Sequence, residues 1–165
     1  MGWALARLEC VADVLDSMRK PINATERNER IAGKAQADLF PYYGATGQVG
    51  YIDDYIFDSK YILLGEDGAP FLDRSATKAY IIDGKTWVNN HAHILAAQID
   101  TEFLCYALND VNFGEYVNGT TRLKLTQADM NRIALAVPPM NEQKRIADTI
   151  TAIYRILDEI TSNIA

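Results

Sequence analysis

The stretch Pro138-Pro-Met-Asn-Glu-Gln-Lys-Arg-Ile-Ala147 opens the last segment of the chain, which continues to Ala165 without another proline or glycine. Through this segment, apolar residues recur at intervals of 4, 3, 4, 3 and 4. A mean period of about 3.5 is typical of an a/d seam, along which one helix packs lengthwise on another. We call these residues the seam; they are Ile146, Ile150, Ile153, Leu157, Ile160 and Ile164.

The two prolines predict where this helix begins, because proline blocks helix in the residues before it. Asn141 is a candidate N-cap that would accept a hydrogen bond from an amide one turn further on. Roughly 23 helical residues at about 1.5 Å each give a rod of about 35 Å, which is long for so small a domain. A helix folded back on its own domain is one interpretation. The narrow, one-sided seam favours the other, a helix that packs on a partner.

Length and composition are those of a soluble globular domain with one appendage. The chain has 165 residues, of which 48% are hydrophobic, and a net charge of −6. No apolar run approaches the roughly 18 residues of a membrane span, and the N-terminus lacks the pattern of a signal peptide. Cys10 and Cys105 are isolated thiols, which favours a reducing cytoplasm. Because the net charge is acidic, contact with nucleic acid would depend on local basic clusters.

Short aromatic-rich segments separated by turn signals follow Leu39 and predict strands. After them, Asp100 is a candidate cap for a helix over 100–109, and Thr126 opens a short helix. The fold class predicted is therefore α+β: a curved, mostly antiparallel sheet with short helices, followed by a long C-terminal coiled-coil-type helix. The expected strands are 51–57, 61–64, 79–82, 87–97 and 133–137.

Two motifs invite a binding site but fit a structural role better. Gly44-x-x-Gly47-x-x-Gly50 lacks the G-K-[ST] ending of a phosphate loop and leads into a strand, which favours turn glycines. His91-x-His93 would place two imidazoles on one face of a strand. No third metal ligand has recognisable spacing, so hydrogen-bonded, partly buried histidines are the better interpretation.

A metal-dependent nuclease is the alternative that the sequence leaves open. The triplets Asp58-Ser-Lys60 and Asp83-Gly-Lys85 resemble the acid-x-Lys element of such enzymes, although both coincide with predicted turns. No set of Ser, His and Asp or of Cys and His has recognisable catalytic flanks. The chain is therefore predicted to be no enzyme, and no cofactor or metal is predicted.

Basic residues in predicted loops and strand ends are the candidates for DNA contact, because Arg and Lys neutralise phosphates and Arg reads base edges. Five of them lie within residues 19–36, a segment poor in large apolar residues that is expected to be a long exposed loop or a loosely held helix. From charge alone, an ordinary solvated surface is the better interpretation. The candidates are Arg19, Lys20, Arg27, Arg30, Lys34, Arg74, Lys78, Arg122 and Lys124.

Several longer motifs, in order along nearly the whole chain, resemble the specificity subunits of type I restriction-modification systems. They include Pro41-Tyr-Tyr-Gly-Ala-Thr-Gly-Gln-Val-Gly-Tyr-Ile-Asp-Asp-Tyr55, Asn90-His-Ala-His-Ile-Leu95 and Val137-Pro-Pro-Met-Asn-Glu-Gln-Lys-Arg-Ile-Ala147. The resemblance implies a target recognition domain over 1–137 and a spacer and dimerisation helix over 138–165. Typical members carry two of each, so this chain resembles half a subunit.

The resemblance also implies a function. The chain would be a non-catalytic DNA-recognition subunit that reads one half of a bipartite site and docks methylation and restriction subunits, which carry the chemistry. Two copies joined through the seam would read an interrupted palindrome with half-sites about one helical turn apart. A helix-mediated interaction module without a DNA role remains a further alternative beside the nuclease.

Overall fold

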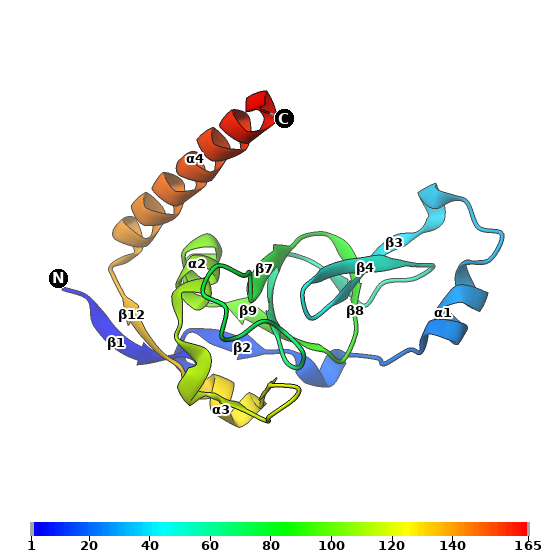
Figure 1. Ribbon diagram of the computed structural model, residues 1–165, viewed down its shortest axis with the longest axis horizontal. Coiled ribbons are helices and arrows are strands. Elements are labelled where there is room, and N and C mark those ends of the chain that lie inside the picture. Colours follow the sequence, from blue (N-terminus) through cyan, green and yellow to red (C-terminus); the bar gives the residue numbers. More distant parts are fainter. Residues whose placement is uncertain (1, 165) are drawn as a thin grey trace.

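The computed structural model describes residues 2–164; Ala165, the predicted last residue of the C-terminal helix, lies outside this range. Figure 1 shows a body built of short strands and three short helices, from which one long helix projects. The helices are α1 (Ala24–Ile31), α2 (Thr101–Asp110), α3 (Gln127–Asn131) and α4 (Met140–Ile164). The strands are β1 (Ala4–Arg7), β2 (Ala12–Val14), β3 (Phe40–Gly44), β4 (Gly47–Ile52), β5 (Phe57–Asp58), β6 (Tyr61–Gly65), β7 (Ala79–Ile82), β8 (Lys85–Val88), β9 (Ala92–Ala97), β10 (Val117–Asn118), β11 (Lys124–Leu125) and β12 (Ala134–Val137).

The strands form two four-stranded sheets and two ribbons, which confirms the predicted α+β class with antiparallel pairing. The main sheet has the order β2-β9-β6-β7 and is antiparallel throughout. The second sheet has the order β4-β3-β8-β5, and its β3–β8 pair is parallel. The ribbons β1–β12 and β10–β11 are both antiparallel. The β1–β12 ribbon leads directly into α4 (Figure 1).

The core lies on both faces of the main sheet, so the central strand β6 is apolar without alternation. On β6, Ile62 and Leu64 belong to the cluster that also contains Leu104 and Leu108 of α2. Leu63, between them, belongs to a second cluster, against which Tyr43 of β3 packs. The second sheet therefore covers one face of the main sheet, and α2 covers the other.

Local capping explains why the two short helices after the sheets were predictable. The Asp100 side chain accepts a hydrogen bond from the Phe103 amide at 2.9 Å and caps α2. Thr126 accepts from the Asp129 amide and caps α3. Both caps confirm the sequence prediction, because each depends on residues three apart.

Three boundary predictions were wrong. The expected strand over 51–57 covers the end of β4 and the start of β5, and residues 53–56 between them belong to neither strand. Asn141 does not cap α4, since the helix already begins at Met140 and the amides of Glu142 and Gln143 donate to the Pro139 carbonyl. The expected strand over 87–97 is two strands, β8 and β9. Between them, the Asn89 side chain accepts from the His91 amide in a tight turn. Asn side chains favour such turns over continued strand.

The glycine motif at 44–50 is a hairpin, as predicted: Gly44 ends β3, Gly47 starts β4, and Gly47 has a φ of +137° that favours glycine. Residues 19–36 contain α1, which has no buried residue and so fits the expected loosely held helix. None of the helices in the described range is both long enough and apolar enough to cross a membrane.

Candidate nucleic-acid interface

The predicted DNA-contacting cations do not form one basic patch. The structure places them in three regions: around α1 and the second sheet, around the loops that follow β6 and β10, and along the segment before β7. Most of them already have an acidic or aromatic partner within the domain. The net charge of −6 means that acidic residues outnumber basic ones, so carboxylates are available to pair with these cations.

The α1 region holds its cations against rings and one carboxylate. Arg27 lies 4.8 Å from the Tyr42 ring centroid, and Arg30 lies 5.1 Å from that of Trp87. Arg30 and Lys34 also reach opposite oxygens of Asp53, each at 2.6 Å. The Lys34 hydrogen bond, with the Arg30 contacts, lowers the pKa of Asp53 below its usual value despite the opposing desolvation. Cation–π and ionic contacts therefore attach α1 to the sheet.

Around Glu66, a second network contains both Arg19 and Lys124. The Arg19 guanidinium donates to Glu66 at 2.6 Å and to the Ala92 carbonyl at 2.8 Å. Lys124 lies 3.2 Å from the other Glu66 oxygen. Arg19 is mostly enclosed, whereas about half of the Lys124 side chain is exposed. Lys124 therefore remains available to a ligand and Arg19 does not.

His93 is buried inside this network and is hydrogen-bonded on both sides, as the sequence predicted for a structural histidine. Its Nδ1 lies 2.5 Å from Asp16, and its Nε2 lies 2.9 Å from the Leu125 carbonyl. Both ring nitrogens therefore have a partner within the domain. Burial of Asp16 opposes ionisation, yet the hydrogen bond and charge of His93, with smaller contributions from the Ile94 amide and Arg19, hold the pKa of Asp16 below its ordinary value.

Asp16, Glu66 and His93 also form a possible metal-ligand group, with their ligand atoms within 4.8 Å of one another. Arg19 contacts both carboxylates, at 3.3 Å and 2.6 Å. Its guanidinium already supplies the positive charge that a cation would bring. The arrangement therefore fits an internal ion-pair network and does not require a metal.

Burial rules out Lys78 as a DNA contact, whereas the charged groups of Lys20 and Arg74 are exposed. Lys78 is only 1% exposed and lies beneath the loop before β7, so its ammonium cannot reach a phosphate on the surface. Lys20 and Arg74 are exposed and have no ion pair among residues 2–164. They are better placed for phosphate contact than the cations around Asp53.

Four loops meet at a surface hollow of about 570 Å³ that sequence reasoning missed, apart from Arg122. Its lining combines polar side chains with glycine and apolar residues, among them Gly44, Ala45 and Val49. His91 at its edge lies 3.0 Å from Asp67, which also binds Arg122. The only available signal was polar residues at consecutive strand ends, since the loops are far apart in sequence. The polar lining residues are Thr46, Asp67, Asn89, His91, Thr121 and Arg122.

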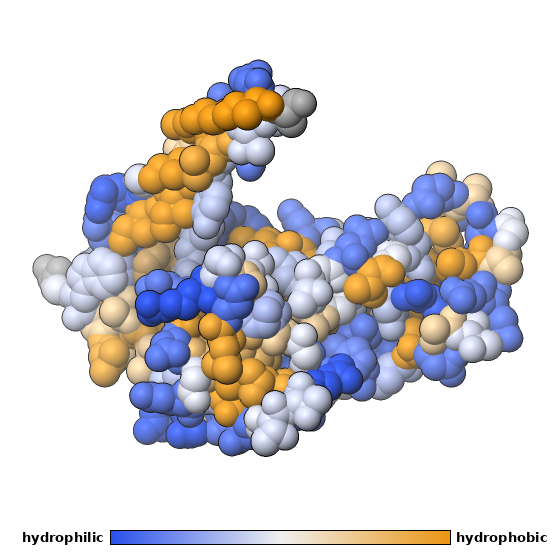
Figure 2. Space-filling view, in the orientation of Figure 1, coloured by the Kyte–Doolittle hydropathy of each residue, from blue (hydrophilic) through white to orange (hydrophobic). Residues whose placement is uncertain are grey.

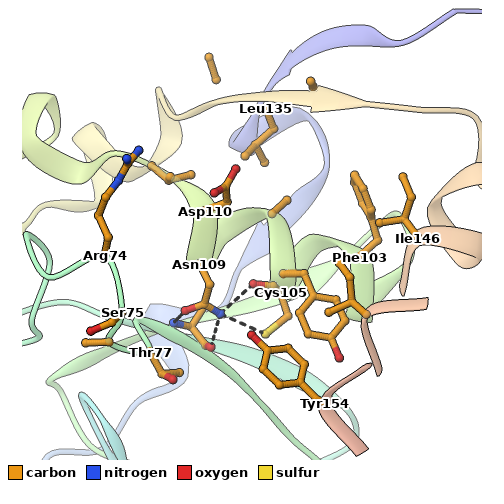
Figure 3. A pocket seen from close by; sticks show the side chains of 18 of the residues that line it. Arg74, Ser75, Thr77, Phe103, Cys105, Asn109, Asp110, Leu135, Ile146 and Tyr154 are labelled. Atoms are coloured by element: carbon orange, nitrogen blue, oxygen red, sulfur yellow. Dashed lines mark hydrogen bonds between the residues drawn. The ribbon is translucent and has the colours of Figure 1, made fainter. Parts of the chain in front are cut away.

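A larger groove of about 820 Å³ lies where α4 leaves the body. Figure 3 shows Phe103 of α2 and Ile146 and Tyr154 of α4 on one side of it, with Arg74 at the opposite rim. Trp3 and Leu135, from the β1–β12 ribbon, add apolar surface. Cys105 also lines the groove, and burial raises the pKa of its thiol to about 12, so it is unreactive.

The seam is covered at its start and bare beyond. Ile146 and Ile150 are half-buried beside α2, whereas Ile153, Leu157, Ile160 and Ile164 are each at least half exposed. Figure 2 shows the apolar surface continuing along the projecting part of α4. A different face of the helix packs on the body, through Gln143, Ala147, Thr151 and Tyr154.

The acid-x-Lys triplets do not build the nuclease site. Asp83 accepts a hydrogen bond from the Gly84 amide in an ordinary turn, and Lys60 pairs with Glu102 of α2. Among the described residues, the one group with metal-ligand spacing is the Arg19-bound cluster around His93. The geometry therefore gives the nuclease alternative no support.

Comparison with known proteins gives one consistent result. A family model described as the type I restriction modification DNA specificity domain matches residues 2–165. A Haemophilus influenzae protein described as a type I restriction enzyme specificity subunit is 31% identical over 157 residues, covering 94% of this chain and 36% of that protein. The specificity subunit of the Escherichia coli type I restriction enzyme EcoprrI is 24% identical, covering 81% of this chain and 32% of that protein.

Solved structures share the fold. A type I restriction-modification S subunit from M. genitalium matches with a TM-score of 0.73 and 17% identity, over 98% of this chain and 41% of that one. The HsdS subunit of Thermoanaerobacter tengcongensis matches with a TM-score of 0.64 and 14% identity, over 99% and 40%. This chain thus spans less than half the length of these relatives.

Proposed function

This chain belongs to the family of type I restriction-modification DNA specificity domains, and from that premise we propose that it reads one half of a bipartite DNA sequence. The family confirms the prediction of a specificity subunit rather than an enzyme. The observation that carries the half-site proposal is the exposed seam on the part of α4 that projects from the body. Exposed apolar surface of this extent marks an interaction site, and a second helix packed on the seam would remove that surface from water.

The two proposed parts of the molecule follow one another along the chain. Residues 1–137 form the recognition domain, and residues 138–165 form the spacer and dimerisation helix. The division is supported by the end of β12 at Val137, by the start of α4 at Met140, and by the exposed far half of α4. At about 1.5 Å per residue, the 25 residues of α4 extend about 37 Å, close to one turn of B-DNA.

The partner that best fits the seam is a second copy of the same seam, running antiparallel. Every seam residue has a counterpart equally far from Arg155: Ile153 with Leu157, Ile150 with Ile160, and Ile146 with Ile164. A two-fold axis that crosses the seam at the level of residue 155 would place each seam residue opposite its counterpart in the second copy. The pairing is then apolar at every level, and the two recognition domains lie at opposite ends of the rod.

Charge supports self-pairing as well. In a paired helix, the positions flanking the seam approach the partner and select it through their charges. In α4 the flanking positions that do not pack on the body are uncharged: Thr149, Ile156, Thr161 and Asn163. The charged residues occupy the outer positions: Lys144, Arg145, Asp148, Arg155, Asp158 and Glu159. Two identical helices can therefore meet without like-charge repulsion.

The groove at the root of α4 is the natural end of this contact. Antiparallel pairing brings Ile160 and Ile164 of the second copy opposite Ile150 and Ile146, which line the groove with Phe103. The second recognition half of a longer chain could supply the same helix. In either case, the second helix covers the groove, and the exposed end of the first seam packs on the other molecule or half.

Methylation and restriction subunits complete the proposed assembly and carry its chemistry in the cytoplasm. The net charge of −6 and the internally paired cations predict weak DNA binding by the chain alone. Within the chain, the exposed cations Lys20, Arg74, Arg122 and Lys124 are the proposed DNA contacts. Partner subunits would supply many of the remaining contacts to the DNA phosphates.

Selection of bound sequences from a random DNA pool tests the proposal, using this chain assembled with its methylation subunit. Two short conserved blocks separated by an unconserved gap are expected. A pool without enrichment would overturn the recognition function. Incubation of the pure chain with plasmid and Mg²⁺ is expected to leave the plasmid intact, and cleavage would instead favour the nuclease.

Dimerisation has its own test in Leu157→Asp, which places a carboxylate opposite Ile153 of the second copy. Loss of one buried leucine costs about 1.5–3 kcal/mol, and the buried charge adds to this, so we expect association at least roughly 100-fold weaker by analytical ultracentrifugation. Ala152→Asp, on the outer side of the same helix, is the matched control. Equal association of both variants would exclude the seam as the contact.

A further inference from the structure

Arg122 is an exposed arginine whose head group is fixed from two sides. Its side chain is 62% exposed, yet its guanidinium donates to Asp67. On the other side it lies against Gly68, where a Cβ would come within 3.2 Å of the Arg122 Nε. Gly68 also has a φ of +69°, so both its conformation and the space beside it require glycine.

The backbone that carries Arg122 is fixed as well. Gly119, with a φ of +116°, turns so tightly that a Cβ there would lie 2.4 Å from the Arg122 carbonyl oxygen. The Gly68 amide donates to the Leu123 carbonyl at 3.1 Å, which joins the two loops directly. An arginine held in this way loses less conformational entropy when it binds than a free one does.

The surroundings of Arg122 suit a base edge better than a phosphate. Arg122 is the one Lys or Arg among the residues that line the hollow, beside the neutral side chains of Thr46, Asn89 and Thr121 and the apolar ones of Ala45 and Val49. Asp67 carries a negative charge at the same place, which disfavours a phosphate. An arginine fork pairs with O6 and N7 of guanine in the major groove, and such contacts specify sequence, whereas phosphate contacts fix position.

We propose that Arg122 is a specificity-determining residue that reads a guanine in the half-site, with Asp67 and Gly68 as positioning residues. The inference rests on the proposed DNA-recognition function and deepens it. The other cations lack this combination: Arg19 is enclosed by Glu66 and the Ala92 carbonyl, and Arg30 is committed to Asp53 and Trp87.

Arg132 is the matched control. It is 57% exposed and also pairs with a carboxylate, that of Asp129, but it lies at the end of α3 and does not line the hollow. Arg122→Lys keeps the charge and loses the fork, whereas Arg122→Ala loses both. Thermal unfolding of each variant establishes that it is folded before binding is measured.

The experiment repeats the random-pool selection with wild type, the two Arg122 variants and Arg132→Ala, each assembled with the methylation subunit. Binding is then measured to the wild-type consensus and to its single-base substitutions. We expect a guanine at which both Arg122 variants lose about 10- to 100-fold of discrimination, while Arg132→Ala keeps the full consensus. Arg122→Lys failing like Arg122→Ala identifies the fork, rather than the charge, as the reader.

Two results would overturn the inference while leaving DNA recognition in place. One is an unchanged consensus with Arg122→Ala. The other is equal weakening on every sequence, with a salt dependence of binding reduced by about one phosphate contact, which would make Arg122 a backbone contact. A wild-type pool without any consensus would overturn both the inference and the function beneath it.

Discussion

His93 ties three parts of the chain together from inside the main sheet. Its ring links Asp16, which follows β2, to the Leu125 carbonyl of β11, while Arg19 joins Asp16 to Glu66 after β6. The Asp16 and Glu66 carboxylates and the Arg19 guanidinium are largely buried, so each depends on the others to remain charged. The network thereby fixes the loops from which Lys124 and Arg122 reach the surface.

Asp16→Asn is expected to destabilise the fold by roughly 3 kcal/mol near neutral pH, because it leaves His93 and Arg19 without their anion. Since the folded-state pKa of Asp16 lies below its unfolded value of 3.8, its contribution is fully present above that value. It is lost as the pH falls through the lower, folded-state pKa. Urea unfolding measured from neutral pH downward should show wild type approaching the variant only in acid.

A constant difference between the two proteins across this pH range would contradict the role given to Asp16. Asp13→Asn is the control, since Asp13 is an exposed carboxylate on β2 that accepts a hydrogen bond from Gln98 and lies outside the His93 network. That variant should change stability by no more than about 0.5 kcal/mol.

Which cations are free could not be predicted from the sequence. Arg30 and Lys34 meet Asp53 from 23 and 19 residues away, and Arg19 meets Glu66 from 47. Such pairs are set by strand order, which composition does not reveal. Lys78 was misjudged for the same reason: it is 1% exposed, and its amide donates to Asn109, 31 residues further along the chain.

The direction of α4 depends on one buried glutamine. Gln143 is 3% exposed; its side-chain oxygen accepts from the Asp100 amide at 3.0 Å, and its nitrogen donates to the Pro138 carbonyl at 2.8 Å. Tyr106 of α2 continues the contact, bonding Thr151 and stacking on Tyr154. These contacts join α4 to α2 and to the segment before each helix.

Gln143→Ala is expected to lower the free energy of unfolding by about 1–3 kcal/mol, because it leaves two buried backbone groups without partners. Gln98→Ala, which removes an exposed hydrogen bond to Asp13, should cost no more than about 0.5 kcal/mol. Urea denaturation of both variants makes the comparison. Equal losses would mean that the junction does not depend on Gln143.

Elements were predictable where their signals are local. The caps Asp100 and Thr126 act over three residues and were identified correctly. The turn at Asn89 interrupts an otherwise apolar run, so the sequence suggested one strand where two exist. The period of the seam predicted the long helix, but only the packing of Gln143 and Ala147 shows that a different face meets the body.

The molecule as a whole combines a body with enclosed apolar cores and a helix whose apolar seam is partly exposed. Its core clusters are enclosed by the two sheets, α2 and α3, while the far half of the seam is exposed. The loop hollow that contains Arg122 could not be found from the sequence, since it exists only when four separate turns meet. The hollow and the exposed part of the seam are therefore separate surfaces of one chain.

Lengthening the spacer tests the central proposal most directly. Duplicating residues 150–156 adds one heptad, which keeps the seam in register and lengthens the rod by about 10 Å, equal to roughly three base pairs. In the random-pool selection with the methylation subunit, the account predicts unchanged half-sites and a gap wider by about three base pairs. The same gap as wild type would contradict the proposal that α4 sets the distance between two DNA-reading domains.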